Sequence, residues 1–136
     1  MLKVFCVIPA YNEEDSIIGV IDAVKPLVSE VVVVDDCSTD RTFELARAKG
    51  ATVLRHILNR GQGAALKTGT EHALRKGADI IVHFDADGQF LAEEIKDVIS
   101  PITNGEEEIV FGSRFLSKKS QIPFFKKNAI MPLAKL

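Results

Sequence analysis

The 136-residue sequence predicts an α/β fold, in which helices cover both faces of a mostly parallel sheet. Short apolar runs rich in Val and Ile alternate with segments whose apolar residues recur at helical spacing. The connections between these segments are short, and strands joined through helices in this way pair in parallel. With 46% hydrophobic and 26% charged residues, the composition is that of a single globular domain with a core.

The expected strands are short β-branched runs, and they occupy residues 4–8, 31–34, 52–54, 80–84 and 109–111. The first is expected to stop at Pro9, because proline cannot donate to a ladder. Between the strands lie the expected helices: one with an apolar face from Ile17 to Val28, then 43–48, 64–75 and 91–99. Gly50, Gly77 and Pro101 are the expected terminators of the last three helices.

The charge is distributed unevenly. Residues 1–113 carry 11 Lys and Arg against 19 Asp and Glu, whereas residues 114–136 carry six basic residues and no acidic one. The net charge of −2 argues against nucleic acid as a general partner. Two interpretations of the basic end stay open, namely contact with a membrane surface or lipid phosphate, and a solvated tail. Cys6 and Cys37 lack metal-ligand spacing, which indicates reduced thiols and a cytoplasmic protein.

Polar side chains follow the expected strands at the points where function gathers in such folds. Asp85 and Asp87 directly follow the run at 80–84, and residues i and i+2 of a strand point to the same side. Together with the amide oxygen of Gln89 they form an all-oxygen set suited to Mg²⁺ or Mn²⁺ that must also hold a phosphate. The alternative is an acidic turn that only caps the next helix.

Three familiar ligand-binding motifs are excluded by position. A dinucleotide fingerprint needs glycines directly after the first strand, where this chain has none. A P-loop starting at Gly61 would need glycine in place of Leu66. A calcium loop starting at Asp85 would need glycine in place of Phe90.

Five motifs, taken in chain order, resemble family 2 glycosyltransferases. They are Val7-Ile8-Pro9-Ala10-Tyr11-Asn12-Glu13-Glu14, Asp35-Asp36-x-Ser38-x-Asp40-x-Thr42, Asn59-Arg60-Gly61-x-Gly63-x-Ala65, Asp85-Ala86-Asp87-x-Gln89 and Gly112-Ser113-Arg114-Phe115. The similarity is strongest to the dolichol-phosphate mannosyltransferase or polyprenyl-phosphate glycosyltransferase branch, and it covers residues 3 to 115. It implies a GT-A fold with a Rossmann-like sheet.

The resemblance also implies a ligand and roles for individual residues. The donor would be a nucleoside-diphosphate sugar carrying GDP or UDP. The residues implied to bind it are Pro9, Tyr11, Asn12, Glu13, Asp35, Asp36, Ala86 and Arg114. Asp85 and Asp87 would be the catalytic residues, because they and Gln89 would hold Mg²⁺ or Mn²⁺ at the diphosphate. His56, His72 and His83 stand singly and are expected to be structural.

The implied reaction is inverting sugar transfer to an acceptor, and a polyprenyl (dolichyl) phosphate is the expected one. A lipid phosphate is already anionic and needs no general base, and no acidic residue follows Glu108. Family members continue well past the Gly-Ser-Arg-Phe segment. We therefore expect residues 1–115 to form a nucleotide-sugar-binding domain and residues 116–136 to be a basic tail that begins an incomplete acceptor region.

Two other functions stay open at this stage. The chain could be a truncated domain that binds a nucleotide-sugar without transferring it. It could also be a phospho-receiver module, although receivers pair their acidic residues after the first strand, whereas Asp35 and Asp36 follow the second. The expected location is the cytoplasm, at the inner face of the membrane if the basic tail binds there. The apolar residues of that tail could also pair two chains.

Overall fold

The structure is a computed structural model, and it describes residues 1–88 and 91–108. The described part contains a four-stranded parallel sheet with the strand order β3-β2-β1-β4. Its strands are β1 (Val4–Ala10), β2 (Glu30–Asp35), β3 (Thr52–Arg55) and β4 (Ile80–His83). Its helices are α1 (Ile17–Val24), the 3-10 helix η1 (Lys25–Leu27), α2 (Thr42–Ala48), α3 (Gln62–Arg75) and α4 (Glu94–Thr103). The predicted parallel α/β fold is confirmed.

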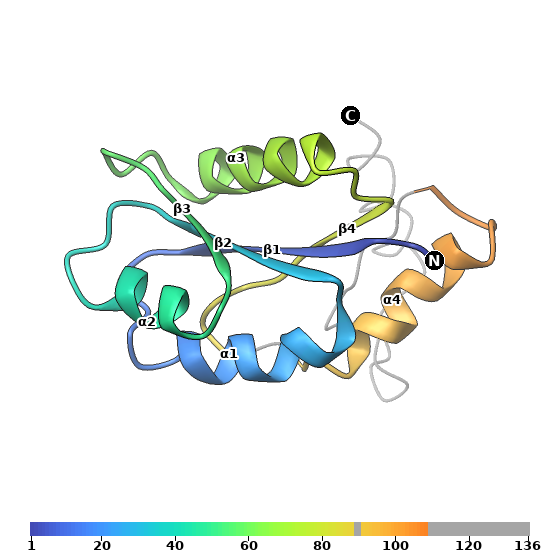
Figure 1. Cartoon of the computed structure of the whole chain (residues 1–136), viewed down its shortest axis with the longest axis horizontal. Coiled ribbons are helices and arrows are strands. Elements are labelled where there is room, and N and C mark those ends of the chain that lie inside the picture. Colours follow the sequence, from blue (N-terminus) through green and yellow to red (C-terminus); the bar gives the residue numbers. More distant parts are fainter. Residues whose placement is uncertain (89–90, 109–136) are drawn as a thin grey trace, which may run out of the picture.

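Helices cover both faces of the sheet, with α3 on one face and α1, α2 and α4 on the other (Figure 1). Alternate residues of β1 supply the two cores, because successive strand residues point to opposite faces. Cys6 and Ile8 pack with Ile17 and other residues of the three-helix layer. Phe5 and Val7 pack under α3. The sheet is therefore buried on both sides, as the uninterrupted apolar strand sequences predicted.

Helix α3 lies unusually close to the sheet because residue 69 is a glycine. A Cβ atom at Gly69 would lie 2.3 Å from Cγ1 of Val7 and 3.0 Å from Cγ2 of Val34. Real Cβ atoms do not come so near to a branched side chain in a packed core. The close approach fixes α3, and the loop that leads into it, over the ends of β1 and β2.

The helix expected to reach Val28 ends at Val24 and is followed by the 3-10 turn η1. The two predicted stops at proline are also wrong. Strand β1 continues through Pro9, which stands opposite Val34 of β2. The carbonyl oxygen of Val7 faces β4, so Pro9, two residues on, presents its missing N–H to that same side. Pairing with β4 has already ended there, at Val7 opposite His83, and no ladder bond is lost.

Helix α4 likewise continues through Pro101 to Thr103. Tertiary packing explains this, because Ile95 is buried in the core and Ile102 packs against it from the last turn. The Pro101 carbonyl oxygen still accepts hydrogen bonds from the N–H groups of Glu106 and Glu107 at 2.9 and 3.1 Å. This helix also begins at Glu94 rather than at residue 91.

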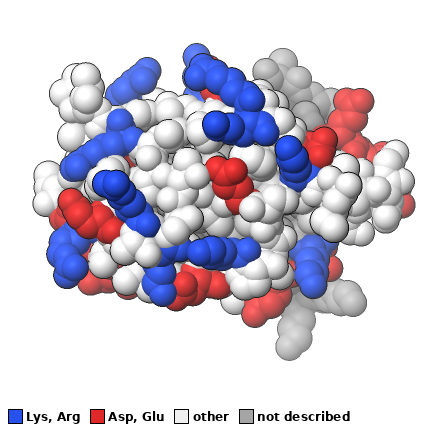
Figure 2. Space-filling model, in the orientation of Figure 1, with Lys and Arg blue, Asp and Glu red and all other residues white. Residues whose placement is uncertain are grey.

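The predicted strand at 109–111 and the basic tail at 116–136 lie outside the described residues. Within residues 1–88 and 91–108, no helix is long and apolar enough to cross a bilayer. Figure 2 shows that basic and acidic side chains are interspersed over the face viewed there.

Candidate functional site

A pocket of about 220 Å³ lies at the carboxyl edge of the sheet. Four chain segments meet in it: the end of β1 with the loop that follows, the residue after β2, the first turn of α3, and the segment after β4. Its lining residues are Pro9, Ala10, Tyr11, Glu13, Asp36, Gln62, Ala65, Asp85, Ala86 and Asp87. The predicted convergence of polar groups from separate strand ends is therefore found in the structure.

The pocket lies where the sheet forks. Strand β1 stays with β2 up to Ala10, whose carbonyl oxygen accepts the N–H of Asp36 at 2.8 Å. On its other side β1 leaves β4 at Val7, whose carbonyl oxygen accepts the N–H of Phe84 at 3.0 Å. The end of β1 and the segment 85–87 then line opposite parts of the pocket. Pro9 suits this position because it has no N–H to bridge the gap.

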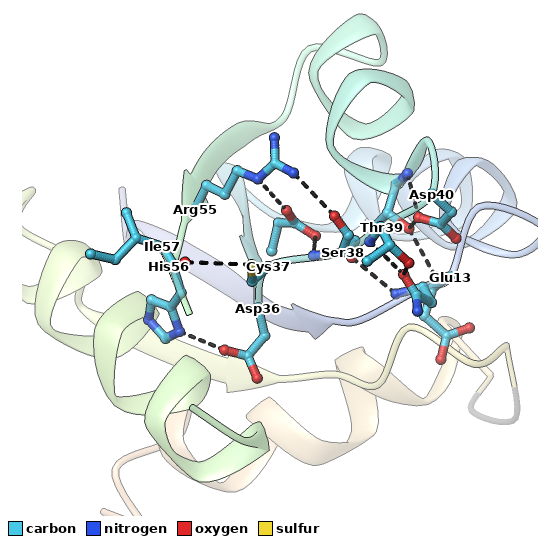
Figure 3. Close-up of polar contacts among 12 residues, drawn as sticks. Glu13, Asp36, Cys37, Ser38, Thr39, Asp40, Arg55, His56 and Ile57 are labelled. Carbon is cyan, nitrogen blue, oxygen red and sulfur yellow. Dashed lines mark hydrogen bonds and ion pairs between the residues drawn. The ribbon is translucent and has the colours of Figure 1, made fainter. Parts of the chain in front are cut away.

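Asp36 is a buried carboxylate of the pocket that accepts three hydrogen bonds from the protein. It is only 4% exposed, and its Oδ1 lies 2.7 Å from Nδ1 of His56 (Figure 3). The same oxygen accepts the N–H of Arg60 at 2.9 Å, and Oδ2 accepts the N–H of Gly61 at 2.8 Å. Burial alone raises the pKa of Asp36, but these hydrogen bonds outweigh it and hold the pKa below its ordinary value of 3.8. Asp36 is therefore ionised at neutral pH.

The loops after β1 and β2 are braced together by side-chain hydrogen bonds. The N–H groups of Asn12 and Glu13 donate to the hydroxyl oxygens of Ser38 and Thr42 at 2.9 and 2.8 Å. In return, the N–H of Thr39 donates to Oδ1 of Asn12 at 2.8 Å. These contacts give Ser38 and Thr42 a structural role, because they hold the loop after β1 against the loop after β2.

Asp35 and Asn12 are predicted binding residues that the structure does not bring into the pocket lining. Asp35 is the last residue of β2, so its side chain points to the opposite face from that of Asp36. It is fully buried, and its Oδ2 lies 3.1 Å from Nε of Arg55. Asn12 braces the loops instead. A part for either residue in ligand binding stays a prediction.

The acidic segment after β4 forms the other side of the pocket. Oδ1 of Asp85 accepts a hydrogen bond from Nε2 of Gln62 at 3.0 Å. The carbonyl oxygen of the buried Ala86 accepts the hydroxyl of Ser16, which ties the segment to the start of α1. Asp87 is exposed at the rim. The charged groups of this side therefore face solvent more than Asp36 does.

The donor set at this side suits a cation that a nucleotide brings with it. Among residues 1–88 and 91–108, no group of three or more His, Cys, Asp or Glu side chains could enclose a metal ion. Asp85 and Asp87 supply hard oxygen ligands, and Mg²⁺ is commonly held by one or two carboxylates with phosphate oxygens and water. The residues present therefore fit Mg²⁺ or Mn²⁺ accompanied by a diphosphate. Gln89 and Arg114, the other predicted ligand-binding residues here, lie outside the described part of the chain.

The sequence did not single out several residues that shape the pocket. Gln62 and Ala65 line it from α3. The family-like motif around Gly61 could have indicated both residues, because they lie in that segment of the sequence. His56, expected to be structural, stands behind the pocket lining in contact with Asp36. Ser16 carried no signal, because its partner at Ala86 lies 70 residues away in the chain.

The comparison with protein families identifies the family of the chain. The model of Glycosyl transferase family 2 matches residues 5–133. The chain belongs to this family. The match includes all four chain segments that line the pocket, and it confirms the family to which the sequence motifs pointed.

Named relatives of this glycosyltransferase-family chain act on lipid phosphates. The UDP-N-acetylglucosamine–dolichyl-phosphate N-acetylglucosaminyltransferase of Methanococcus voltae is 35% identical over 91% of this chain and 57% of that protein. The dolichol-phosphate mannosyltransferase of Pyrococcus furiosus is 35% identical over 93% of this chain and 38% of that protein. The chain thus spans about half the length, or less, of these curated relatives.

The fold comparison agrees with the sequence comparison. Glucosyl-3-phosphoglycerate synthase from Mycobacterium tuberculosis, solved with Mn²⁺, UDP-glucose and phosphoglyceric acid, matches with a TM-score of 0.65 and 32% identity. The match covers 77% of this chain and 40% of that one. The fold is therefore of the GT-A type, as the resemblance implied.

Proposed function

We propose that this chain forms the donor-binding part of a metal-dependent, inverting glycosyltransferase, which moves a sugar from a nucleoside diphosphate to a polyprenyl phosphate. The observation that carries the proposal is the single pocket that joins Asp36 and Tyr11 on one side to Asp85 and Asp87 on the other. A nucleoside diphosphate has the matching division into a base with its ribose and a charged diphosphate.

The side formed by Pro9, Tyr11, Glu13 and Asp36 suits the nucleoside. Tyr11 is 46% exposed although it is aromatic, and it offers a ring face for a base or ribose. The ionised Asp36 accepts a hydrogen bond from a hydroxyl or N–H of the nucleoside. Asn12 and Asp35 would support this side from outside the lining, whereas Ala86 lines the acidic side.

The acidic side suits the diphosphate. Asp85 and Asp87, with Gln89, would hold Mg²⁺ or Mn²⁺, and Arg114 would lie near the phosphates. A divalent cation, when bound, stabilises the negative charge that the departing nucleoside diphosphate gains. The presence of Mn²⁺ with UDP-glucose in the Mycobacterium tuberculosis synthase supports this assignment.

The acceptor assignment comes from the relatives, whose names include dolichyl and undecaprenyl phosphates. A phosphate oxygen is already a nucleophile and needs no base from the protein. The reaction would take place at the cytoplasmic face of a membrane, where the basic residues of 114–136 meet anionic lipid. Whether the donor carries uridine or guanosine is left to experiment, because both occur in the predicted ligand class.

Calorimetric titration with UDP and GDP tests the proposal. Binding is expected with Mn²⁺ or Mg²⁺ present, and it is expected to be lost in EDTA and in the Asp87→Ala variant. The proposal fails if neither nucleotide binds in a metal-dependent way. Binding and transfer are tested separately, since the chain spans about half of its relatives. A single-turnover assay with polyprenyl phosphate and UDP- or GDP-sugars separates a transferase from a domain that only binds the donor.

A further inference from the structure

His56 is a buried, ionisable side chain that lies behind the pocket rather than in its lining. It follows β3 and is only 8% exposed. Its Nδ1 lies 2.7 Å from Oδ1 of Asp36, and its Nε2 lies 2.8 Å from Oγ1 of Thr68 in α3. One imidazole thus joins the residue after β2, the residue after β3 and the helix that covers the sheet. Figure 3 shows its contact with Asp36.

The hydrogen-bond chemistry fixes the direction of the contact with Asp36. An ionised carboxylate only accepts, so Nδ1 of His56 carries the proton and donates it. The hydroxyl of Thr68 also lies 3.0 Å from the carbonyl oxygen of Ala64, which only accepts. Whether that hydroxyl donates to Ala64 or to Nε2, the Nδ1–H group stays directed at Asp36. The contact is therefore independent of the protonation of Nε2.

The carboxylate of Asp36 is almost filled by donors from the protein. A carboxylate offers about four acceptor positions. His56 and the N–H groups of Arg60 and Gly61 occupy three of them. Arg60 and Gly61 belong to one loop, which is fixed at its start by the N–H of His56 on the Asp35 carbonyl oxygen at 2.9 Å. Gly61 has a φ of 92°, so the loop takes a shape that other residues adopt only with strain.

We propose that His56 is a positioning residue of the donor site: it holds Asp36 in one orientation, with one acceptor position left open to the pocket for a single hydroxyl or N–H of the nucleoside. This inference rests on the proposed function. In this proposal His56, which lies outside the pocket lining, determines how tightly the nucleoside part of the donor binds. The diphosphate part is left to Asp85 and Asp87, whose side of the pocket His56 does not contact.

The sharpest test compares His56→Asn with His56→Gln, because both introduce an amide group but on side chains of different length. In His56→Asn the short side chain can place an N–H near the position of Nδ1 and so keep the donor to Asp36. In His56→Gln the longer side chain reaches toward Thr68 and leaves Asp36 without that donor. His56→Ala removes both contacts, and Thr68→Val removes only the partner of Nε2.

Calorimetry with Mn²⁺ measures each variant against the nucleotide that the wild-type chain binds and against inorganic pyrophosphate. His56→Ala and His56→Gln are expected to weaken nucleotide binding about tenfold, the cost of losing one hydrogen bond to a charged group. His56→Asn is expected to recover most of the affinity. The affinity for Mn²⁺-pyrophosphate is expected to stay within about twofold in all variants. Thr68→Val is expected to change nucleotide affinity less than His56→Gln does.

Several results would overturn the inference. Equal nucleotide affinity in wild type and His56→Gln would do so, as would equal losses for nucleotide and pyrophosphate, which indicate general damage to the fold. If His56→Ala does not fold, the comparison of the Asn and Gln variants decides. A wild-type chain that binds no nucleotide contradicts the proposed function itself. In that case ¹⁵N NMR of the imidazole still tests the geometry, since the inference requires a proton on Nδ1 of His56 in the free protein.

Discussion

The two sides of the pocket are built in different ways. On the nucleoside side, Asp36 is buried and accepts three hydrogen bonds from His56, Arg60 and Gly61. On the acidic side, Asp87 is exposed and Asp85 is half-buried beside the amide of Gln62. The comparison teaches that the fold itself orders the carboxylate on the side proposed for the nucleoside, whereas it leaves the carboxylates of the acidic side more exposed to solvent. Changes on the two sides should therefore affect different parts of ligand binding.

The largest expected effect comes from the acidic side. Asp87→Asn keeps the size of the side chain and removes its charge, so metal-dependent nucleotide binding should weaken at least about 100-fold. Thermal unfolding without ligand should hardly change, because Asp87 is exposed. Asp97→Asn, an exposed residue of α4 outside the pocket, is the matched control for the loss of one negative charge. If both variants bind nucleotide like wild type, Asp87 has no part in the site.

The next effect concerns the support of the nucleoside side. Gly69→Ala should lower the free energy of unfolding by about 1–3 kcal/mol, because the new methyl group would overlap Val7 and Val34. Gly63→Ala, in the first turn of the same helix, has open space at its Cβ and should cause no loss. Urea unfolding measures both. An unchanged stability in Gly69→Ala would mean that α3 is free to move off the sheet.

A smaller effect concerns the pH dependence of stability, which should report on the buried carboxylate of Asp36. The folded pKa of Asp36 lies below 3.8, its ordinary value. Its hydrogen bonds therefore stabilise the fold fully above that pH, and their contribution is lost as the pH falls through the lower folded pKa. Urea unfolding between about pH 5 and about pH 2 should show a shallower decline for Asp36→Asn than for wild type. Parallel curves for the two proteins would contradict the assignment.

The smallest expected effect tests the link between the two sides. Ser16→Ala removes the hydroxyl that donates to the Ala86 carbonyl oxygen, and it should cost about 1 kcal/mol of stability. Nucleotide affinity should fall a few-fold in addition, because the acidic segment loses its tie to the β1 loop. Ser29→Ala is the control, since its hydroxyl accepts the N–H of Val4 at the opposite edge of the sheet. It should lower stability similarly while leaving nucleotide affinity unchanged.

The sequence was sufficient for the fold and for the meeting of polar strand ends at one edge of the sheet, because both depend on local patterns. Buried parallel strands are recognisable as apolar runs, and a parallel topology brings their carboxyl ends to one edge. The predictions at Pro9 and Pro101 failed because each followed a local rule that tertiary context overrides. In α4, the packing of Ile102 against the core outweighs the break expected at Pro101. A strand whose neighbour has ended has no hydrogen bond to lose.

The sequence could not predict which way the side chains of neighbouring acidic residues point. Asp35 and Asp36 are equivalent in type, and alternation states only that they point to opposite faces. Which face holds the pocket depends on where β3 and α3 pack. The contact between His56 and Asp36 spans 20 residues and depends on the same packing, so no local pattern could reveal it.

The fork in the sheet has a consequence for how this region can vary between related chains. The last paired residue of β4 is His83, and Asp85 stands two positions beyond it. Deleting one residue between them would shift the acidic segment by about 3.3 Å relative to the rest of the pocket lining. The number of residues between the end of β4 and Asp85 therefore determines where this carboxylate lies in the pocket. Along this stretch, substitutions of Phe84 that keep its bulk should be tolerated, whereas insertions and deletions should not.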